Sequence, residues 1–116
     1  MAVERRRFVR ARPTSDFDLR VEVSHDGITY VLQVVDVGVG GIGLLLEHPI
    51  DKRSVGEELP LTLTLPSELR FTATGRVQHR SEPTQVCGVE LTSLDQGQSG
   101  ALSRYVGDLL VRGQAS

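Results

Sequence analysis

Hydrophobic and polar residues alternate along most of the chain beyond residue 15, and this period of two predicts half-buried β-strands. The clearest run is residues 59–65, in which four leucines alternate with proline and threonine. Asp26-Gly27 is a typical turn signal between two such runs, so they are expected to form a hairpin. The six expected strands are residues 19–24, 29–37, 41–46, 59–65, 71–77 and 85–91.

The period changes near Leu94, where apolar residues recur at helical spacing. This apolar stripe consists of Leu102, Tyr105, Val106, Leu109 and Leu110. Ser93 and Gln96, three residues apart, are typical of a capping box at a helix start. Six short antiparallel strands must close or nearly close to protect their edges, and a helix can cover an open end. The pattern therefore predicts an all-β fold, a six-stranded antiparallel β-barrel with one C-terminal helix at about residues 94–112.

The length of 116 residues, 39% of them hydrophobic, suits one core and not two lobes. No apolar run approaches the roughly 20 residues of a membrane helix, and residues 1–12 lack the apolar stretch of a secretion signal. We therefore expect a cytoplasmic protein that does not insert into a membrane. The single cysteine, Cys87, excludes an internal disulfide, and its alternation with Val89 and Leu91 predicts that it faces the core.

The net charge of -2 conceals an uneven distribution of charge. Residues 1–12 contain five arginines and one glutamate, so they carry +4 and the rest of the chain carries -6. Pro13 closes this polar segment, and we expect an arginine-rich arm at residues 1–14 followed by the barrel at residues 15–116. An acidic body is unsuited to coating nucleic acid, whereas the arm suits a small anionic partner.

No pattern in the sequence predicts an enzyme or a metal site. Residues 38–43 spell G-x-G-x-x-G after an apolar strand, but the dinucleotide fingerprint needs a helix there and residues 44–49 end in proline. No Lys-Ser or Lys-Thr follows the glycines, which excludes a P-loop. The three histidines lack partners at metal-ligand spacing, and no nucleophile-elbow sequence is present.

Two motifs remain, far apart in the sequence. Arg6 and Arg10 form R-x-x-x-R with Arg5 directly before it, and residues 36–41 read Asp-Val-Gly-Val-Gly-Gly. Together, and in this order, they resemble the PilZ domain, the bacterial receptor module for cyclic di-GMP, whose signature is an RxxxR arm and a [D/N]xSxxG segment. A later Gly-Val-Glu-Leu strand at residues 88–91 and a closing helix agree with the six-stranded barrel of that family. The resemblance covers nearly the whole chain.

The resemblance implies that Arg6 and Arg10 grip guanine and phosphate, with Arg5 as an added clamp. Guanidinium groups suit this task because they bond phosphate or a guanine edge through two parallel N–H groups and stack on bases. Asp36 would accept hydrogen bonds from guanine N1 and N2, groups that distinguish guanine from adenine.

Gly38 and Gly41 would let the backbone approach the ligand. Gly38 occupies the position of the family's usual serine, and loss of one neutral hydrogen bond weakens binding by about tenfold or less.

We therefore expect a receptor whose arm orders around cyclic di-GMP and changes the surface offered to a downstream protein. The first alternative is a PilZ-like adaptor that has lost the nucleotide and acts through protein contacts. Outside this family, the alternative is a nucleic-acid-binding barrel, which should expose aromatic stacking residues; aromatics form only 4% of the chain. For either motif alone, a solvated tail or a tight strand connection is the simpler interpretation.

Overall fold

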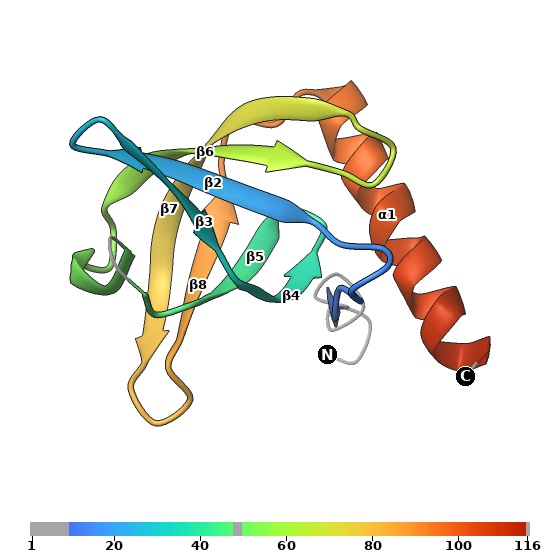
Figure 1. Ribbon diagram of the computed structural model, residues 1–116, viewed down its shortest axis with the longest axis horizontal. Helices are drawn as coiled ribbons and strands as arrows, with labels where there is room; N and C mark the ends of the chain where they lie inside the picture. Colours follow the sequence, from blue (N-terminus) through green and yellow to red (C-terminus); the bar gives the residue numbers. More distant parts are fainter. Residues whose placement is uncertain (1–9, 48–49, 116) are drawn as a thin grey trace, which may run out of the picture.

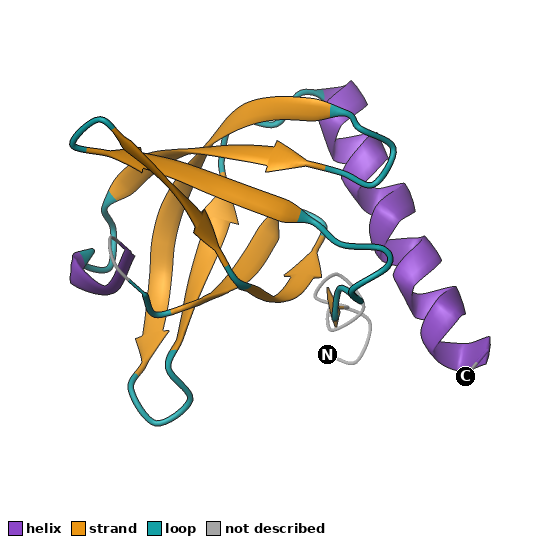
Figure 2. Ribbon diagram, viewed as in Figure 1, coloured by secondary structure: helices purple, strands orange, loops and turns teal. Residues whose placement is uncertain are grey.

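The structure is a computed structural model that describes residues 10–47 and 50–115. In this part of the chain, one antiparallel sheet of eight strands is accompanied by a long C-terminal helix (Figures 1 and 2). The strands are β1 (Arg10–Ala11), β2 (Arg20–His25), β3 (Ile28–Leu32), β4 (Val34–Gly38), β5 (Gly41–Leu45), β6 (Glu58–Thr64), β7 (Arg70–Ser81) and β8 (Val86–Leu91). The helices are the short 3-10 turn η2 (Ile50–Lys52) and α1 (Gln96–Ala115).

The all-β class with one C-terminal helix is confirmed, but the sheet differs from the expected six-stranded closed barrel. Its strand order is β1-β4-β5-β8-β7-β6-β2-β3, and within the described residues no pairing joins the two ends. The expected strand 29–37 is two strands, because β3 pairs with β2 whereas β4 pairs with β5. β1 is the other addition, paired with β4. Alternation determines which side chains are buried, but it does not determine hydrogen-bonding partners, so neither the break at Gln33 nor β1 was predictable.

The core is filled from the inward positions of the alternating strands, as the pattern predicts. Leu61 and Leu63 of β6 are fully buried, and so are Ile42 and Leu44 of β5. Cys87 is also completely buried, which confirms that it faces the core. Burial raises the pKa of its thiol, so it behaves as a small apolar group.

Helix α1 lies across one end of the curved sheet (Figure 1). Four residues of its predicted apolar stripe are buried, whereas Leu110 at the edge of the stripe is 36% exposed. The helix start differs from the prediction: the backbone N–H of Gln98 donates to Asp95 Oδ1 (2.8 Å), and that of Asp95 donates to Gln98 Oε1 (3.1 Å). This reciprocal pair is the capping box. Ser93 instead accepts a hydrogen bond from the backbone N–H of Thr74 (2.7 Å), which joins it to β7.

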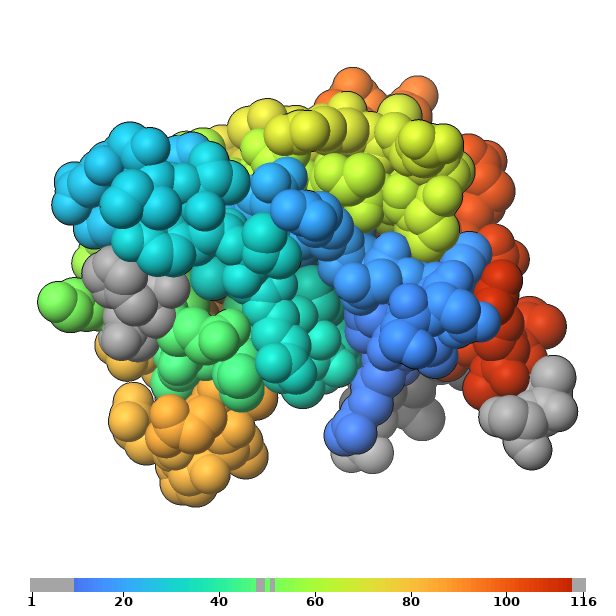
Figure 3. Space-filling model, in the orientation of Figure 1, coloured from blue at the N-terminus to red at the C-terminus, as the bar shows by residue number. Residues whose placement is uncertain are grey.

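The segment between β1 and β2 is attached to α1 by one aromatic residue. The Phe17 and Tyr105 rings lie 5.2 Å apart, and the Tyr105 hydroxyl donates to the Phe17 carbonyl at 2.8 Å. The guanidinium of Arg112 lies over the Phe17 ring, 3.9 Å from its centre. Arg112 Nη1 is also 3.6 Å from Asp16 Oδ2. Figure 3 shows the N-terminal segment, in blue, against the helix, in red. The chain that follows the arginine-rich arm is therefore fixed to the helix.

Candidate ligand-binding site

Arg10 and Asp36, two residues predicted to contact the ligand, are in contact with each other. β1 pairs Arg10 with Gly38 on β4, so the arginine side chain starts beside the strand that carries Asp36. Arg10 Nε and Nη2 donate to Asp36 Oδ1 at 3.0 and 2.8 Å. The two side chains are 36% and 32% exposed, so the pair is partly shielded from water but remains accessible. The fold thus brings together the second arginine of R-x-x-x-R and the carboxylate of the other motif.

Glycines beneath this ion pair make room for it. A Cβ atom built at Gly41 would lie 3.4 Å from Arg10 Nη1, and one built at Gly43 would collide with the Asp36 carboxylate. Gly43 is the strand partner of Asp36, so the carboxylate lies directly over a neighbour without a side chain. Gly40 has a different role: its φ of 92° is the left-handed conformation that turns β4 into β5.

The outward face of neighbouring strands is paved by four glycines, which we call the glycine floor: Gly38, Gly41, Gly43 and Gly88. Gly38 pairs with Gly41 across β4 and β5, and Gly43 pairs with Gly88 across β5 and β8. Paired residues of antiparallel strands project from the same face, so these four positions form one surface without side chains of its own, in which Gly38, Gly43 and Gly88 are buried and Gly41 is partly exposed. Because glycine has no side chain, a ligand can approach the backbone more closely at these positions than it could at any other residue type.

A groove of about 430 Å³ lies over three of these glycines, Gly38, Gly41 and Gly88. Arg10 lines it from β1, and His79 and Gln78 line it from β7. Sequence reasoning selected Gly38 and Gly41, but it missed the part of the groove contributed by β7 and β8. Only their pairing with the predicted segment brings these strands to the site.

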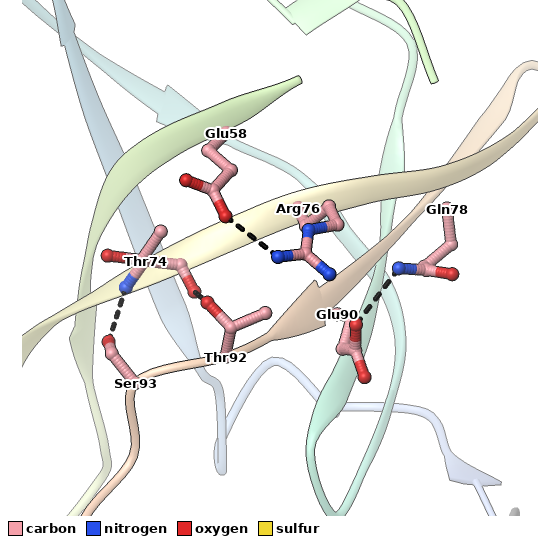
Figure 4. A network of polar contacts seen from close by, with 7 residues as sticks. All are labelled: Glu58, Thr74, Arg76, Gln78, Glu90, Thr92 and Ser93. Carbon is pink, nitrogen blue, oxygen red and sulfur yellow. Dashed lines mark hydrogen bonds and ion pairs between the residues drawn. The ribbon is translucent and has the colours of Figure 1, made fainter. Parts of the chain in front are cut away.

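The outer surface of β7 continues from the groove as a series of polar pairs (Figure 4). Gln78 Nε2 donates to Glu90 Oε1, and Arg76 Nη2 donates to Glu58 Oε2, both at 3.0 Å. The ion pairs Arg76–Glu58 and Arg10–Asp36 are each neutral overall, whereas the Glu90 carboxylate, bonded to a neutral amide, adds a negative charge beside the groove. A dianionic ligand would need further cations, and Arg5 and Arg6, the predicted source, lie outside the described residues.

Neither a metal centre nor a membrane helix is found in the part of the chain that the structure describes. No three His, Cys, Asp or Glu side chains gather there in a group that could hold a metal ion. None of the described helices combines the length and the apolar character needed to cross a membrane.

The fold is an antiparallel β-domain with an arginine–carboxylate pair beside a glycine-lined groove, and a comparison with known families shows which family it belongs to. A family model, the PilZ domain, matches residues 4–108. The chain belongs to the PilZ domain family. A comparison with curated protein sequences found no match.

Solved structures with the same fold include several PilZ proteins. The PilZ domain of Escherichia coli YcgR, solved with c-di-GMP, has a TM-score of 0.70 and 13% identity, with 92% of each chain covered. The K. pneumonia MrkH–c-di-GMP complex has a TM-score of 0.73 and 17% identity, with coverage of 90% of this chain and 51% of MrkH. The Bacillus subtilis inhibitor of motility MotI/DgrA has a TM-score of 0.70 and 20% identity, with coverage of 90% and 50%. The chain thus spans about half the length of MrkH and MotI.

Proposed function

We propose that this PilZ domain is a receptor for cyclic di-GMP and not an enzyme. The observation that carries the proposal is the contact between Arg10 and Asp36 beside the glycine floor. Family membership and the c-di-GMP complexes of the structural neighbours MrkH and YcgR support the choice of ligand. We further propose that the protein acts in the bacterial cytoplasm.

In the proposed complex, the pair of Arg10 and Asp36 is an anchor that one guanine joins. Among the described residues, both donors of Arg10 meet Oδ1 of Asp36, and in the proposed complex Oδ2 would accept from guanine N1 and N2. Arg10 Nη1, over Gly41, faces the groove and would donate to the ligand. The floor at Gly38 and Gly41 would admit the ligand backbone closely, and Arg5 and Arg6 would supply the positive charge that the described groove lacks.

Binding would bring the first arginines of the arm, residues 1–14, onto the ligand beside the barrel domain, residues 15–116, whereas β1 within the arm is already paired with β4. The arm continues into the segment that is fixed to α1 through Phe17 and Tyr105. A change in the position of the arm would therefore alter the surface beside the helix, which a downstream protein would recognise.

Titration calorimetry with cyclic di-GMP at low and moderate salt tests this proposal. Arg10→Ala and Arg6→Ala should each weaken binding by well over tenfold, since a charge-assisted hydrogen bond contributes about 1.5–3 kcal/mol. Arg70→Ala is the matched control, because Arg70 lies at the other end of β7 and pairs with Glu22 at 3.5 Å. No heat at micromolar wild-type protein would refute the receptor function, and unchanged affinity in both arm variants would move the site elsewhere.

A second candidate, an adaptor without nucleotide, is favoured by one observation, the glycine at position 38 where the family usually has serine. Gly38→Ser separates the two functions. For a receptor, the added hydroxyl should tighten an existing affinity by about tenfold or less. An adaptor would show no binding in the wild-type protein, and its amide resonances around residues 36–41 would not move when nucleotide is added.

A further inference from the structure

His79 lies over Gly88, one of the four residues of the glycine floor. A Cβ atom built at Gly88 would collide with the His79 ring, with Nε2 nearest and both Cδ2 and Cε1 only 2.7 Å away. Because the two carbons that flank Nε2 are nearly as close as Nε2 itself, the ring lies with one face over the glycine and does not point at it edge-on. One face of the imidazole is thus supported by backbone, and the residue lines the groove.

A β-bulge gives His79 this position. The pairing of β7 with β8 shifts between Val77 and His79, so Gln78 is an extra residue on the bulged strand. Both Gln78 and His79 then line the groove, Gln78 reaching Glu90 while His79 covers Gly88. Bulges commonly re-aim a side chain beside a functional site.

Arg10 and His79 face the same stretch of floor from opposite sides. The strand order β1-β4-β5-β8-β7 places their backbones on the two outer strands of the groove. The guanidinium of Arg10 lies over Gly41 on β5, and the imidazole lies over Gly88 on β8. Gly41 pairs with Glu90, two residues beyond Gly88, so the two glycines are diagonal neighbours, roughly 7–8 Å apart. A ligand held by Arg10 therefore comes within reach of the histidine ring.

We propose that His79 is a second ligand-contacting residue, a flat platform on which one base of the bound nucleotide stacks. The inference rests on the proposed function and adds a residue that the two sequence motifs do not contain. Imidazole rings are among the side chains on which unpaired bases stack. The ring is supported by Gly88 beneath it, so little side-chain freedom is lost when a base settles on the other face.

Substitutions at His79 separate stacking from hydrogen bonding. His79→Ala and His79→Gln should weaken cyclic di-GMP binding by about fivefold or more, in line with the loss of one base–aromatic stack. His79→Phe should stay within about threefold of the wild-type affinity, because phenylalanine keeps a flat ring without nitrogen atoms or charge. His25→Ala is the matched control, since His25 lies in the β2–β3 hairpin beside Asp26. Thermal melting of each variant verifies that the exposed site tolerates the change.

The result also distinguishes this inference from the proposed function. Wild-type binding that Arg10→Ala weakens and His79→Ala leaves unchanged would refute the stacking role and leave the receptor function in place. A glutamine variant that binds as well as wild type while the phenylalanine variant is weak would assign a hydrogen bond to position 79 and overturn stacking. No binding by the wild-type protein would refute both.

Discussion

The contact between Asp36 and Gly43 makes Gly43→Ala a sharp test of the site. The new methyl group would collide with the Asp36 carboxylate, whereas its contact with Val86 Cγ1 at 3.5 Å is ordinary. A carboxylate is the movable end of a side chain, so Asp36 should rotate away from the floor while the strand stays in place. The substitution therefore moves Asp36, the residue predicted to bind guanine, without altering its charge.

The expected effect on stability is small because two contributions oppose each other. Losing the pair with Arg10, whose two side chains are 36% and 32% exposed, costs about 0.2–1 kcal/mol. Replacing a glycine inside a strand by alanine contributes roughly 0.5–1 kcal/mol in the stabilising direction. Affinity should respond far more strongly: hydrogen bonds from guanine to a carboxylate are worth about 1.5–3 kcal/mol, so their loss weakens binding about tenfold or more.

Calorimetric titration with cyclic di-GMP and thermal melting measure the two quantities. Gly107→Ala is the matched control, since Gly107 is exposed on α1 and a methyl group there meets no atom within 4 Å. It should raise stability by about 0.5–1 kcal/mol and leave affinity unchanged. Equal affinity of the Gly43→Ala variant and wild type would refute the role of Asp36. A fall in melting temperature by more than about 10 °C would show that the methyl group distorts the strand and does not simply displace the Asp36 carboxylate.

Three further predictions concern the core and the helix contact. Gly75→Ala places a methyl group 2.9 Å from Leu61 Cδ1 and 2.6 Å from Val89 Cγ1, so overpacking should lower the free energy of unfolding by about 1–3 kcal/mol in urea titrations; no loss would mean that the core has space there. Burial raises the pKa of the Tyr105 phenol, so its contribution is intact below pH about 10 and stability should decline as pH rises above that value, less steeply in Tyr105→Phe; equal slopes would contradict this assignment. The Cys87 thiol is buried with a raised pKa, so a thiol reagent should react slowly with native protein and rapidly in denaturant, and rapid native labelling would argue against this packing.

The periodicity of apolar residues was sufficient to predict the fold class and the inward face of most strands. Alternation from Leu59 to Leu65 carries this information locally, because successive residues of a strand project from opposite faces. The helical spacing of Leu102, Tyr105, Val106 and Leu109 likewise identified the buried stripe of α1. The capping box was displaced by two residues, since Ser93 and Asp95 are equally suitable caps and only packing against β7 occupies Ser93.

Tertiary structure alone decided which distant residues share the groove. Asp36 was visible in a motif, but its contact with Arg10, 26 positions away in the sequence, depends on the pairing of β1 with β4. His79 belongs to neither ligand motif, and only a bulge in β7 brings its ring over Gly88. Strand pairing and register are set by the whole sheet, so a local pattern cannot specify them. For this reason the sequence predicted Arg10, Asp36 and the glycines of β4 and β5 as site residues, whereas the contribution of β7 and β8 to the groove could be seen only in the folded sheet.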